Sequence, residues 1–406
     1  MRHLAKCLLA GALVLALVGG GQALAAENTA PQTAAPAAGT PITTFYKGGD
    51  FSMLHYIERK GGKFYRQDGT QANALDIAKD HGVNIARVRI YNDPGPGRGD
   101  GTWYCPPNYV IERDALRIAG EARERGMAIE LTLHYSDYWT NGERQNVPHE
   151  WREQLTGLTG EAAVAKLEQL VYDYTKSVME DFKEDDLTPE FISLGNETQG
   201  GMLYPYAQFS TPEGWQNYAR LVNAGARAVR EVAPTTKIIL HIADGGHIDK
   251  GDYFFGNCQQ YGIDYDIMGA SYYPFFHKVK ADKVAAYCDY LHKKYGKQTI
   301  IMETGYAWNR TRSDGWPGQL ENNGPYSDMS KQGQKAFMQE LLTALKAVPD
   351  HGCIGDIYWD PVMIKAPDAG WAQFESNHAT DVNVVDNTTW FDFDGKELPV
   401  LEAYAD

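Results

Sequence analysis

Two glutamates in this sequence each end a strongly apolar run. Glu197 follows FISLGN at 191–196, and Glu303 follows TIIM at 299–302. A carboxyl group is costly to bury in such a place unless it is paired or hydrogen-bonded. Two carboxyls about 5–5.5 Å apart, one protonated and one ionised, are what a retaining glycosidase needs to cleave a glycosidic bond. The pair therefore indicates acid/base and nucleophilic chemistry on a sugar, provided that the fold brings the two side chains together.

Each glutamate alone also has a structural explanation. Asn196 and Glu197 are residue types found at the start of a following helix, and Glu303 would be satisfied equally well in a structural ion pair. Other hydrolytic motifs are missing from the sequence. It has no H-E-x-x-H or C-x-x-C pair to hold a metal and no G-x-S-x-G turn to carry a serine nucleophile.

The elements that must position these glutamates form a regular alternation. Short β-rich runs lie at 45–49, 84–91, 128–134, 191–195, 237–242, 265–272, 298–303 and 355–359. Helical patterns lie between them at 72–81, 111–125, 161–183, 214–232, 281–294 and 331–347. Strands separated by helices pair in parallel, and eight such strands close a barrel. An open doubly wound sheet is the alternative, but no G-x-G-x-x-G turn follows the first strand. We predict an α/β fold, a (β/α)₈ TIM barrel, as a single catalytic domain over 45–406.

Catalytic groups of a parallel barrel lie at the C-terminal ends of its strands. Glu197 and Glu303 end the fourth and seventh predicted strands, which lie across a closed barrel from each other. We therefore expect their carboxyls to face each other over a cleft. Further polar residues and one tryptophan recur at the ends of the other strands: Asp50, Arg87, Arg89, His134, Asp137, His241, Asp244, Tyr273, Trp359 and Asp360.

Several stretches, in order from the first strand to the last, resemble a known family. They are GGDFSMLHYIERKGGKFY (48–65), GVNIARVRIYNDP (82–94), LHYSDYW (133–139), SLGNETQGGMLYP (193–205), DIMGASYYPF (266–275), IIMETGYAW (300–308), IYWDP (357–361) and FDFDGKELP (391–399). Together they are similar to the arabinogalactan endo-β-1,4-galactanases of glycoside hydrolase family 53, part of a clan of (β/α)₈ retaining enzymes. The resemblance covers nearly all of the predicted domain.

The resemblance implies a role for each matching residue. Glu197 would be the general acid/base, with a raised pKa, and Glu303 the ionised nucleophile. Arg87 matches the clan arginine, whose charge would lower the pKa of Glu303. Arg89 lies on the same strand face and is the alternative to Arg87. Asn196 would hydrogen-bond the sugar 2-hydroxyl.

Four further residues would support the cleft. Tyr273 would orient Glu303, and His134 and His241 would line the cleft, although either histidine alone is compatible with a core position. Trp359 is the best candidate for a sugar platform because the apolar face of a pyranose stacks on aromatic rings. Asp137 is expected to shape a loop.

The sequence departs from the family pattern in two places. The usual Tyr-Trp-Glu-Pro-x-Trp reads YWDPVM at 358–363, with a shorter acid and no second tryptophan. The calcium loop of bacterial relatives corresponds to RSDGWPG at 312–318, where most oxygen donors are replaced and Arg312 would repel a cation. We therefore expect no metal and no cofactor.

The N-terminus has the layout of a secretory signal. Arg2 and Lys6 precede an apolar run at 7–18, and Ala23-Leu24-Ala25 offers a cleavage site. The run is too short for an uncleaved membrane anchor. We predict a signal peptide at 1–25, an Ala/Pro/Thr-rich linker at 26–44 and a secreted protein, extracellular or periplasmic.

Composition limits the partners. The net charge of −15 disfavours nucleic acids and anionic membranes and favours a neutral polysaccharide. We expect a monomer. Signal cleavage leaves Cys105, Cys258, Cys288 and Cys353. A Cys258–Cys288 disulfide and free buried thiols both remain open.

The resemblance implies an exported endo-hydrolase of β-1,4-galactan, such as the neutral side chains of pectin, working with retention by double displacement. One alternative is a hydrolase of the same clan that acts on another neutral β-1,4-glycan, namely mannan, xylan or glucan. The other alternative is a carbohydrate-binding barrel without activity.

Overall fold

Eight parallel strands close into a barrel. In this computed structural model, which describes residues 40–95, 103–106, 108–370, 373–374 and 383–405, the barrel strands are β1 (Tyr46–Asp50), β4 (Ile85–Ile90), β6 (Ala128–Leu133), β7 (Phe191–Leu194), β10 (Lys237–Ile242), β11 (Ile267–Tyr272), β12 (Gln298–Thr304) and β13 (Cys353–Tyr358). Their order is β1-β13-β12-β11-β10-β7-β6-β4, and β4 pairs back with β1. The predicted (β/α)₈ barrel is confirmed.

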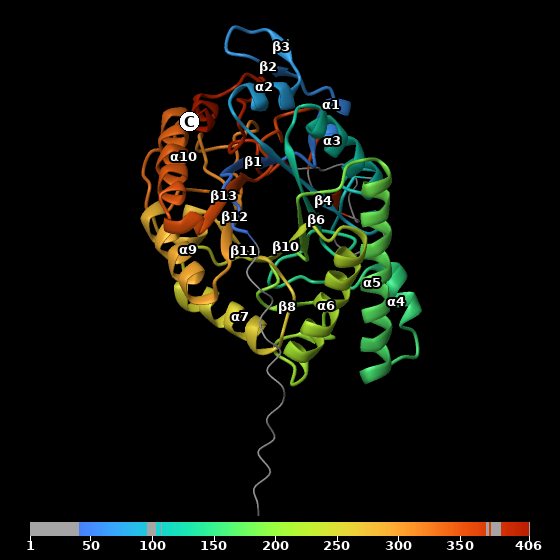
Figure 1. The fold of residues 1–406 in the computed structure, drawn as a ribbon. Helices are drawn as coiled ribbons and strands as arrows, with labels where there is room; N and C mark the ends of the chain where they lie inside the picture. The colour runs from blue at the N-terminus through green and yellow to red at the C-terminus, as the bar shows by residue number, and fades with distance from the viewer. Residues whose placement is uncertain (1–39, 96–102, 107, 371–372, 375–382, 406) are drawn as a thin grey trace, which may run out of the picture. The chain divides into compact units, whose positions relative to one another are not determined.

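Helices surround the barrel, which Figure 1 shows looking along its axis. They include α2 (Ala74–Asp80), α3 (Glu112–Glu124), α5 (Gly160–Glu184), α6 (Gly214–Val232), α7 (Ile248–Gln260), α9 (Ala281–Tyr295) and α10 (Lys331–Lys346). Each turns an apolar stripe toward the strands, as α6 does with Leu221, Val222 and Val229. The helices form because this stripe recurs at helical spacing between polar positions.

The barrel interior is filled by side chains that alternate along the strands. Ile85, Phe191, Ile239, Ile267, Ile300, Met302, Ile354 and Ile357 form this inner cluster. A larger cluster lies between the strands and the helices. Gly269 leaves room for the inner layer, since a Cβ there would lie 2.8 Å from atoms of both Ile239 and Met302. The inner layer supports the polar residues that follow it along each strand.

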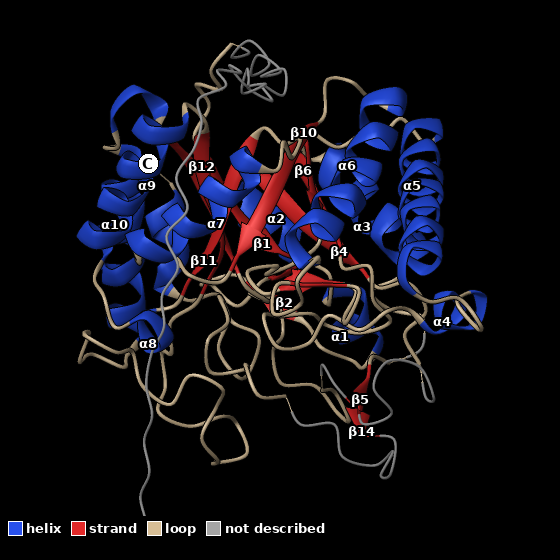
Figure 2. Ribbon diagram, turned by 90° about the horizontal axis from the view of Figure 1, so that it is seen from below, coloured by secondary structure: helices blue, strands red, loops and turns tan. Residues whose placement is uncertain are grey.

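Several smaller elements were not predicted. They are α1 (Leu54–Arg59), α4 (His149–Gln154), α8 (Pro274–His277), the 3₁₀ helices η1 (Pro349–His351) and η2 (Pro399–Tyr404), and the paired short strands β2 (Phe64–Tyr65) with β3 (Gln71–Ala72), β5 (Trp103–Tyr104) with β14 (Gln373–Phe374), and β8 (Gly201–Met202) with β9 (Ala207–Gln208). Helix α7 was missed as well, because its sequence IDKGDYFFGNCQQ contains two glycines and few strong helix formers. The long loops gather at one end of the barrel in Figure 2.

The predicted signal peptide and most of the predicted linker lie outside the described residues. Among the described helices, none is long and apolar enough to cross a membrane. Cys105, Cys258, Cys288 and Cys353 are buried free thiols, so of the two open alternatives the structure holds the free thiols.

Candidate active site

Glu197 and Glu303 lie next to each other at the barrel mouth. One carboxyl oxygen of each, together with a ring nitrogen of His241, lie within 4.8 Å of one another. Both side chains are largely enclosed, with exposed fractions of 8% for Glu197 and 4% for Glu303. The expected meeting of two carboxyls from the ends of β7 and β12 is therefore present in the fold.

Local backbone irregularities aim both glutamates into the mouth. After β7 the chain turns through left-handed conformations, with φ of +93° at Gly195 and +51° at Glu197. In β12, Ile300 and Met302 point into the barrel, so strict alternation would send Glu303 outward. A register shift against β11 between Ala270 and Ser271 places Glu303 opposite Ser271 instead. Such irregularities re-aim side chains near active sites.

Glu303 is held through both of its oxygens. Arg87 Nη1 donates to Oε1 at 2.9 Å, and the Tyr273 hydroxyl donates to Oε2 at 3.0 Å. Arg87 Nη2 also donates to Asn196 Oδ1 at 2.7 Å. One guanidinium thus connects the ends of β7 and β12, which fixes the relative positions of the two glutamates. Of the two arginines considered from the sequence, Arg87 is the one that contacts Glu303.

Arg89 belongs to a different ion-pair site. Its Nη1 and Nη2 donate to the two oxygens of Asp360 at 2.9 and 3.2 Å. Its Nη1 also lies 2.9 Å from Asp50 Oδ2. The guanidinium carbon of Arg89 lies 4.2 Å from the centre of the Trp359 ring, and that of Arg87 lies 5.4 Å from it. Trp359 therefore packs against both arginines, and only 6% of its surface is exposed.

Glu130 is a partner of Arg87 that was not predicted from the sequence. Arg87 is fully buried, and its Nε lies 3.5 Å from Glu130 and 3.6 Å from Asp50. Glu130 is itself fully buried in β6 and accepts from Ser193 at 2.7 Å. A charged residue in the middle of the apolar run AIELTL was the available signal, because such a residue is rarely buried without a partner.

Glu197 contacts neutral groups on the opposite side of the pair. Its Oε1 lies 2.6 Å from Ser271 Oγ, which lies 2.8 Å from His241 Nε2. His241 Nδ1 lies 3.1 Å from Asn196 Oδ1. The two glutamates thus differ in environment, since one touches a cation and the other does not.

This difference separates the two carboxyls electrostatically. Burial and the charge of Glu303 raise the pKa of Glu197 to about 8. Burial also raises the pKa of Glu303, while Arg87 and the Tyr273 hydroxyl act in the opposite direction. The lowering expected from Arg87 is therefore present but outweighed by burial. Glu303 has the stabilised anion, and its charge keeps the proton on Glu197.

His134 has a buried ring N–H without a hydrogen-bond partner among the described residues. The backbone N–H of Thr140 donates to His134 Nδ1 at 3.2 Å, so the ring proton is on Nε2 when the histidine is neutral. His134 Nε2 is buried and has no hydrogen-bond partner among the described residues. It is available to a ligand hydroxyl.

Two other strand-end acids are engaged away from the glutamates. Asp137 accepts from the backbone N–H groups of Asp93 and His149, at 3.2 and 2.6 Å, and so shapes a loop. Asp244 pairs with Lys250 at 2.7 Å. The charge of Asp244 also contributes to the raised pKa of Glu197.

Within the described residues, the one cluster of three metal-ligating groups is Glu197, His241 and Glu303. Its donor atoms are already engaged, because Arg87 binds Glu303 and both nitrogens of His241 have hydrogen-bonding neighbours. The fixed positive charge of Arg87 opposes a cation at this position. The arrangement suits proton transfer and nucleophilic attack rather than metal binding.

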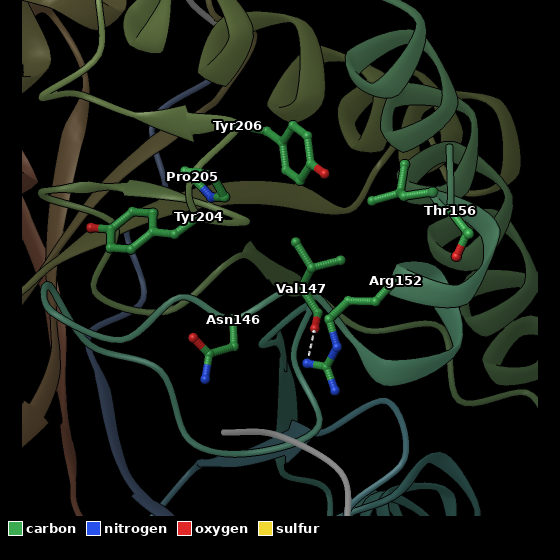
Figure 3. A pocket seen from close by; sticks show the side chains of 8 residues that line it. Asn146, Val147, Arg152, Thr156, Tyr204, Pro205 and Tyr206 are labelled. Carbon is green, nitrogen blue, oxygen red and sulfur yellow. Dashed lines mark hydrogen bonds between the residues drawn. The ribbon is translucent and has the colours of Figure 1, made fainter. Parts of the chain in front are cut away.

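A cavity of about 440 Å³ lies beside the end of β7 (Figure 3). Its walls include Val147, Leu155, Tyr204 and Tyr206. It does not contain the two glutamates, but Gln145 connects it to them. The backbone N–H of Tyr204 donates to the Gln145 carbonyl at 2.7 Å, and Gln145 Nε2 donates to the Asn196 carbonyl at 2.9 Å.

Comparison with known proteins decides the family. Residues 46–404 match the profile of glycosyl hydrolase family 53. The chain belongs to glycosyl hydrolase family 53. It is a glycoside hydrolase, as the sequence predicted, and family members of known structure share its barrel. A family 53 catalytic domain from Ignisphaera aggregans superposes with a TM-score of 0.78 at 29% identity, over 90% of this chain and 96% of that one.

Two curated relatives agree over most of their length. The endo-β-1,4-galactanase of Bacillus subtilis strain 168 is 29% identical over 89% of this chain and 85% of its own. The arabinogalactan endo-β-1,4-galactanase of Cellvibrio japonicus strain Ueda107 is 30% identical over 79% of this chain and 81% of its own. The resemblance noted in the sequence is confirmed.

Proposed function

We propose that this family 53 enzyme cleaves β-1,4-linked galactan internally with retention of configuration, with Glu303 as the nucleophile and Glu197 as the acid/base. The observation that carries the proposal is the separation of their nearest oxygens, within 4.8 Å. Retaining pairs lie about 5–5.5 Å apart, whereas inverting pairs leave roughly 6.5–9.5 Å for a water molecule. The separation therefore favours direct attack by Glu303 on the sugar.

The proton states match these roles. In the first step Glu303 attacks the anomeric carbon while Glu197 gives its proton to the departing glycosidic oxygen. In the second step Glu197 takes a proton from water, the water oxygen attacks the anomeric carbon, and the bond to Glu303 breaks. Arg87 and Tyr273 stabilise the Glu303 carboxylate before attack and again as it is released.

Neighbouring residues are positioned to hold the sugar. The Asn196 side-chain amide donates one proton to the Thr140 carbonyl at 2.9 Å, which leaves its second proton for the sugar 2-hydroxyl. His134 Nε2 offers a further donor, and His241 lies beside the pair. Trp359 packs beside Arg87 and is the proposed aromatic platform for the sugar on that side of the mouth.

Galactan is the proposed polymer because both curated relatives carry galactanase names, and a protein with a net charge of −15 suits a neutral substrate. In vivo the source would be galactan side chains of pectin. We propose no cofactor. In the loop that corresponds to the calcium site, Arg312 donates to both oxygens of Asp314, at 3.2 and 2.7 Å, which supports a loop ordered without a cation.

We also propose that the chain is exported and acts as a monomer, with a signal peptide at 1–25, a linker at 26–44 and the catalytic domain at 45–406. The layout of Arg2, Lys6, the apolar run and Ala23-Leu24-Ala25 supports export. N-terminal sequencing of protein recovered outside the cytoplasm tests it. The expected first residue is Ala26, and a retained Met1 would contradict cleavage.

Azide rescue tests the two catalytic roles. Glu303→Ala should lose several powers of ten in turnover and, with azide and an activated aryl galactoside, form the α-galactosyl azide. Glu197→Ala should form the β-azide, because the glycosyl-enzyme intermediate still forms. Glu153→Ala is the control, since that glutamate side chain is 71% exposed. Near-normal activity of both active-site variants on polymer would refute the assignment.

Product analysis on linear galactan, mannan, xylan and glucan tests the substrate. We expect oligosaccharides of intermediate length from galactan and little release from the others. Strong release from mannan without release from galactan would place the specificity elsewhere in the clan. Binding of galactan without any cleavage would support the carbohydrate-binding alternative.

A further inference from the structure

The hydrogen bonds beside Glu197 have a fixed direction. Arg87 donates to Asn196 Oδ1, and Asn196 Nδ2 donates to the Thr140 carbonyl, so the orientation of the Asn196 amide is set at both ends. His241 Nδ1 faces Asn196 Oδ1 at 3.1 Å and must therefore donate to it. The tautomer of His241 follows, because a neutral imidazole with a proton on Nδ1 has a bare Nε2.

Ser271 lies between His241 and Glu197 in this series of hydrogen bonds. Bare Nε2 of His241 lies 2.8 Å from Ser271 Oγ, so the single hydroxyl proton of Ser271 points to the histidine. While Glu197 is protonated, Ser271 Oγ can accept from Glu197 Oε1, 2.6 Å away, whereas it donates to the same oxygen when the carboxyl is ionised. With the Ser271 proton bonded to His241, the proton in the short contact between these two oxygens is the one on the Glu197 carboxyl group. His241 is kept neutral by burial and by the charge of Arg87, which lower its pKa.

We propose that Ser271 and His241 form a one-way relay that holds the acid proton on Glu197, with both as positioning residues. This rests on the acid/base role proposed above for Glu197. An isolated serine would donate to the carboxylate and favour its ionised form. Here His241 takes the hydroxyl proton, so the same serine favours the protonated form. When Glu197 has given its proton away, the Ser271 hydroxyl turns to the carboxylate and His241 loses its donor, which favours recapture of a proton from water.

Other charged and titratable groups face this relay from every side. They are Arg87 on β4, His134 after β6, Asp244 after β10, Tyr273 after β11 and Glu303 in β12. Among the described residues, none of them donates to Ser271 or accepts from it. They set the electrostatic background, while Ser271 and His241 set the direction of the proton.

Ser271→Ala gives the test, because the two directions predict opposite signs. If the relay is correct, the variant loses the acceptor of the Glu197 proton, and the alkaline limb of kcat/KM on galactan moves down by about 0.5–1 pH unit. If Ser271 instead donates to the carboxylate, the limb moves up. His241→Asn keeps a donor for Asn196 but frees the Ser271 proton for Glu197, so the limb should again move down. An unmoved limb in both variants would also overturn the relay.

Thr175→Val is the matched control, because it removes a buried hydroxyl of α5 that bonds Tyr135 and the Val171 carbonyl rather than either glutamate. The alkaline limb of kcat/KM for this variant should stay in place even if its melting temperature falls. A purely structural role of Ser271 would lower the melting temperature without moving the limb. Failure of the proposed function is distinct, since the unmodified enzyme would then release nothing from galactan at any pH.

The cavity in Figure 3 carries a second, independent inference. Its volume of about 440 Å³ is in the range of small-ligand pockets. The Asn146 amide and the hydroxyls of Thr156 and Tyr206 line it without a hydrogen-bond partner among the described residues. Val147 and Leu155 add apolar surface. Free hydrogen-bonding groups beside rings and aliphatic side chains match a sugar, which has an apolar face and polar edges.

We infer that this cavity binds galactosyl units of the polymer outside the cleaved pair. Its wall is joined through Gln145 to the backbone of Glu197, which accepts from Gln145 Nε2 at 3.3 Å. Gln145 is itself buried, so it fixes the wall of the cavity to the segment that carries Glu197. Arg152 contributes an exposed guanidinium at the rim, with one N–H donated to the Val147 carbonyl at 2.9 Å.

Tyr206→Ala tests the cavity, with Tyr253→Ala as the control because Tyr253 is an exposed tyrosine on α7. The expected result is a rise of three- to tenfold in KM for long linear galactan, with kcat/KM for an activated aryl galactoside unchanged. Equal kinetics of both variants on the polymer would overturn the inference. A loss on both substrates would do so too, because it would indicate a disturbed catalytic pair.

Discussion

Arg87 and Arg89, two arginines of the same strand, both lie near Asp50 but otherwise form ion-pair sites with different partners. Arg87 distributes its donors among Glu303, Asn196 and Thr132, each of which comes from a different strand end or strand. Arg89 directs its donors to two acids, Asp50 and Asp360, which lie on neighbouring strand ends. The first site joins the groups proposed to act on the sugar, and the second joins the ends of β1 and β13.

The difference shows that burial of a charged pair does not by itself mark a catalytic site. Both guanidiniums are almost fully buried, and both contact carboxylates at 2.9 Å. What separates the two sites is whether the second nearby carboxyl is paired with the same arginine. Glu303 has Glu197 within 4.8 Å and at the barrel mouth, whereas Asp360 has Asp50, which shares the same arginine. Trp359 lies against both guanidiniums.

The largest contrast should come from Arg87→Lys. Lysine keeps the charge but cannot reach Glu303 and Asn196 together through a planar fork. Loss of a donor to a group that changes charge in the transition state costs about 10²–10³ in kcat. We expect kcat/KM on galactan to fall by that amount with a folded protein. Activity within threefold of the unmodified enzyme would show that the fork is not used in catalysis.

The same substitution at the second site, Arg89→Lys, should act mainly on stability. It breaks two hydrogen bonds to Asp360 in a buried site, which costs about 2–3 kcal/mol in the free energy of unfolding. We expect a lower denaturant midpoint and kcat/KM within about tenfold at 25 °C, where the protein remains folded. A loss of activity as large as for Arg87→Lys, without destabilisation, would remove the distinction between the sites.

The pH profile should report the unequal environments of the two glutamates. Glu197 must be protonated to act as the acid, and its pKa is raised to about 8. The kcat/KM on galactan should therefore fall about tenfold per pH unit above pH 8. Glu303 must be ionised, so activity should also fall on the acid side, at a pH above the ordinary glutamate pKa because burial raises it. With a substrate that has a good leaving group, the first step needs no proton from Glu197. The alkaline limb of the pH profile for that step should therefore disappear. A profile flat to pH 10 on polymer would contradict the assignment.

The sequence was sufficient to predict the barrel and to place both glutamates at its mouth. Strand ends of a parallel barrel meet at one mouth, so residues that end apolar runs could be placed without coordinates. The choice between Arg87 and Arg89 could not be made this way, because both lie on the same face of β4 and both reach acids. Which acid each reaches depends on neighbouring strand ends, including the register shift that turns Glu303 inward.

Glu130 and the Ser271–His241 contacts illustrate a second limit. Glu130 was visible as a charge within an apolar strand, yet nothing in the sequence names its partner. The direction of the hydrogen bonds at Ser271 depends on the Asn196 amide, which in turn depends on Arg87 and the Thr140 carbonyl. Such a chain of dependence exists only in three dimensions, so spacing along the sequence carries no trace of it.

Asp360→Glu should have the smallest effect and sharpens the comparison most. It introduces the acid of the family motif, but Asp360 is fully buried and its two oxygens already fit Arg89. One more methylene in a packed site costs about 1–3 kcal/mol. We expect a lower denaturant midpoint with kcat unchanged within about twofold, and no change for Asp394→Glu, an exposed acid in the loop before η2. Because the lengthened acid pushes on Arg89 and Trp359 rather than on Arg87, a large fall in kcat would mean that the two arginine sites act as one.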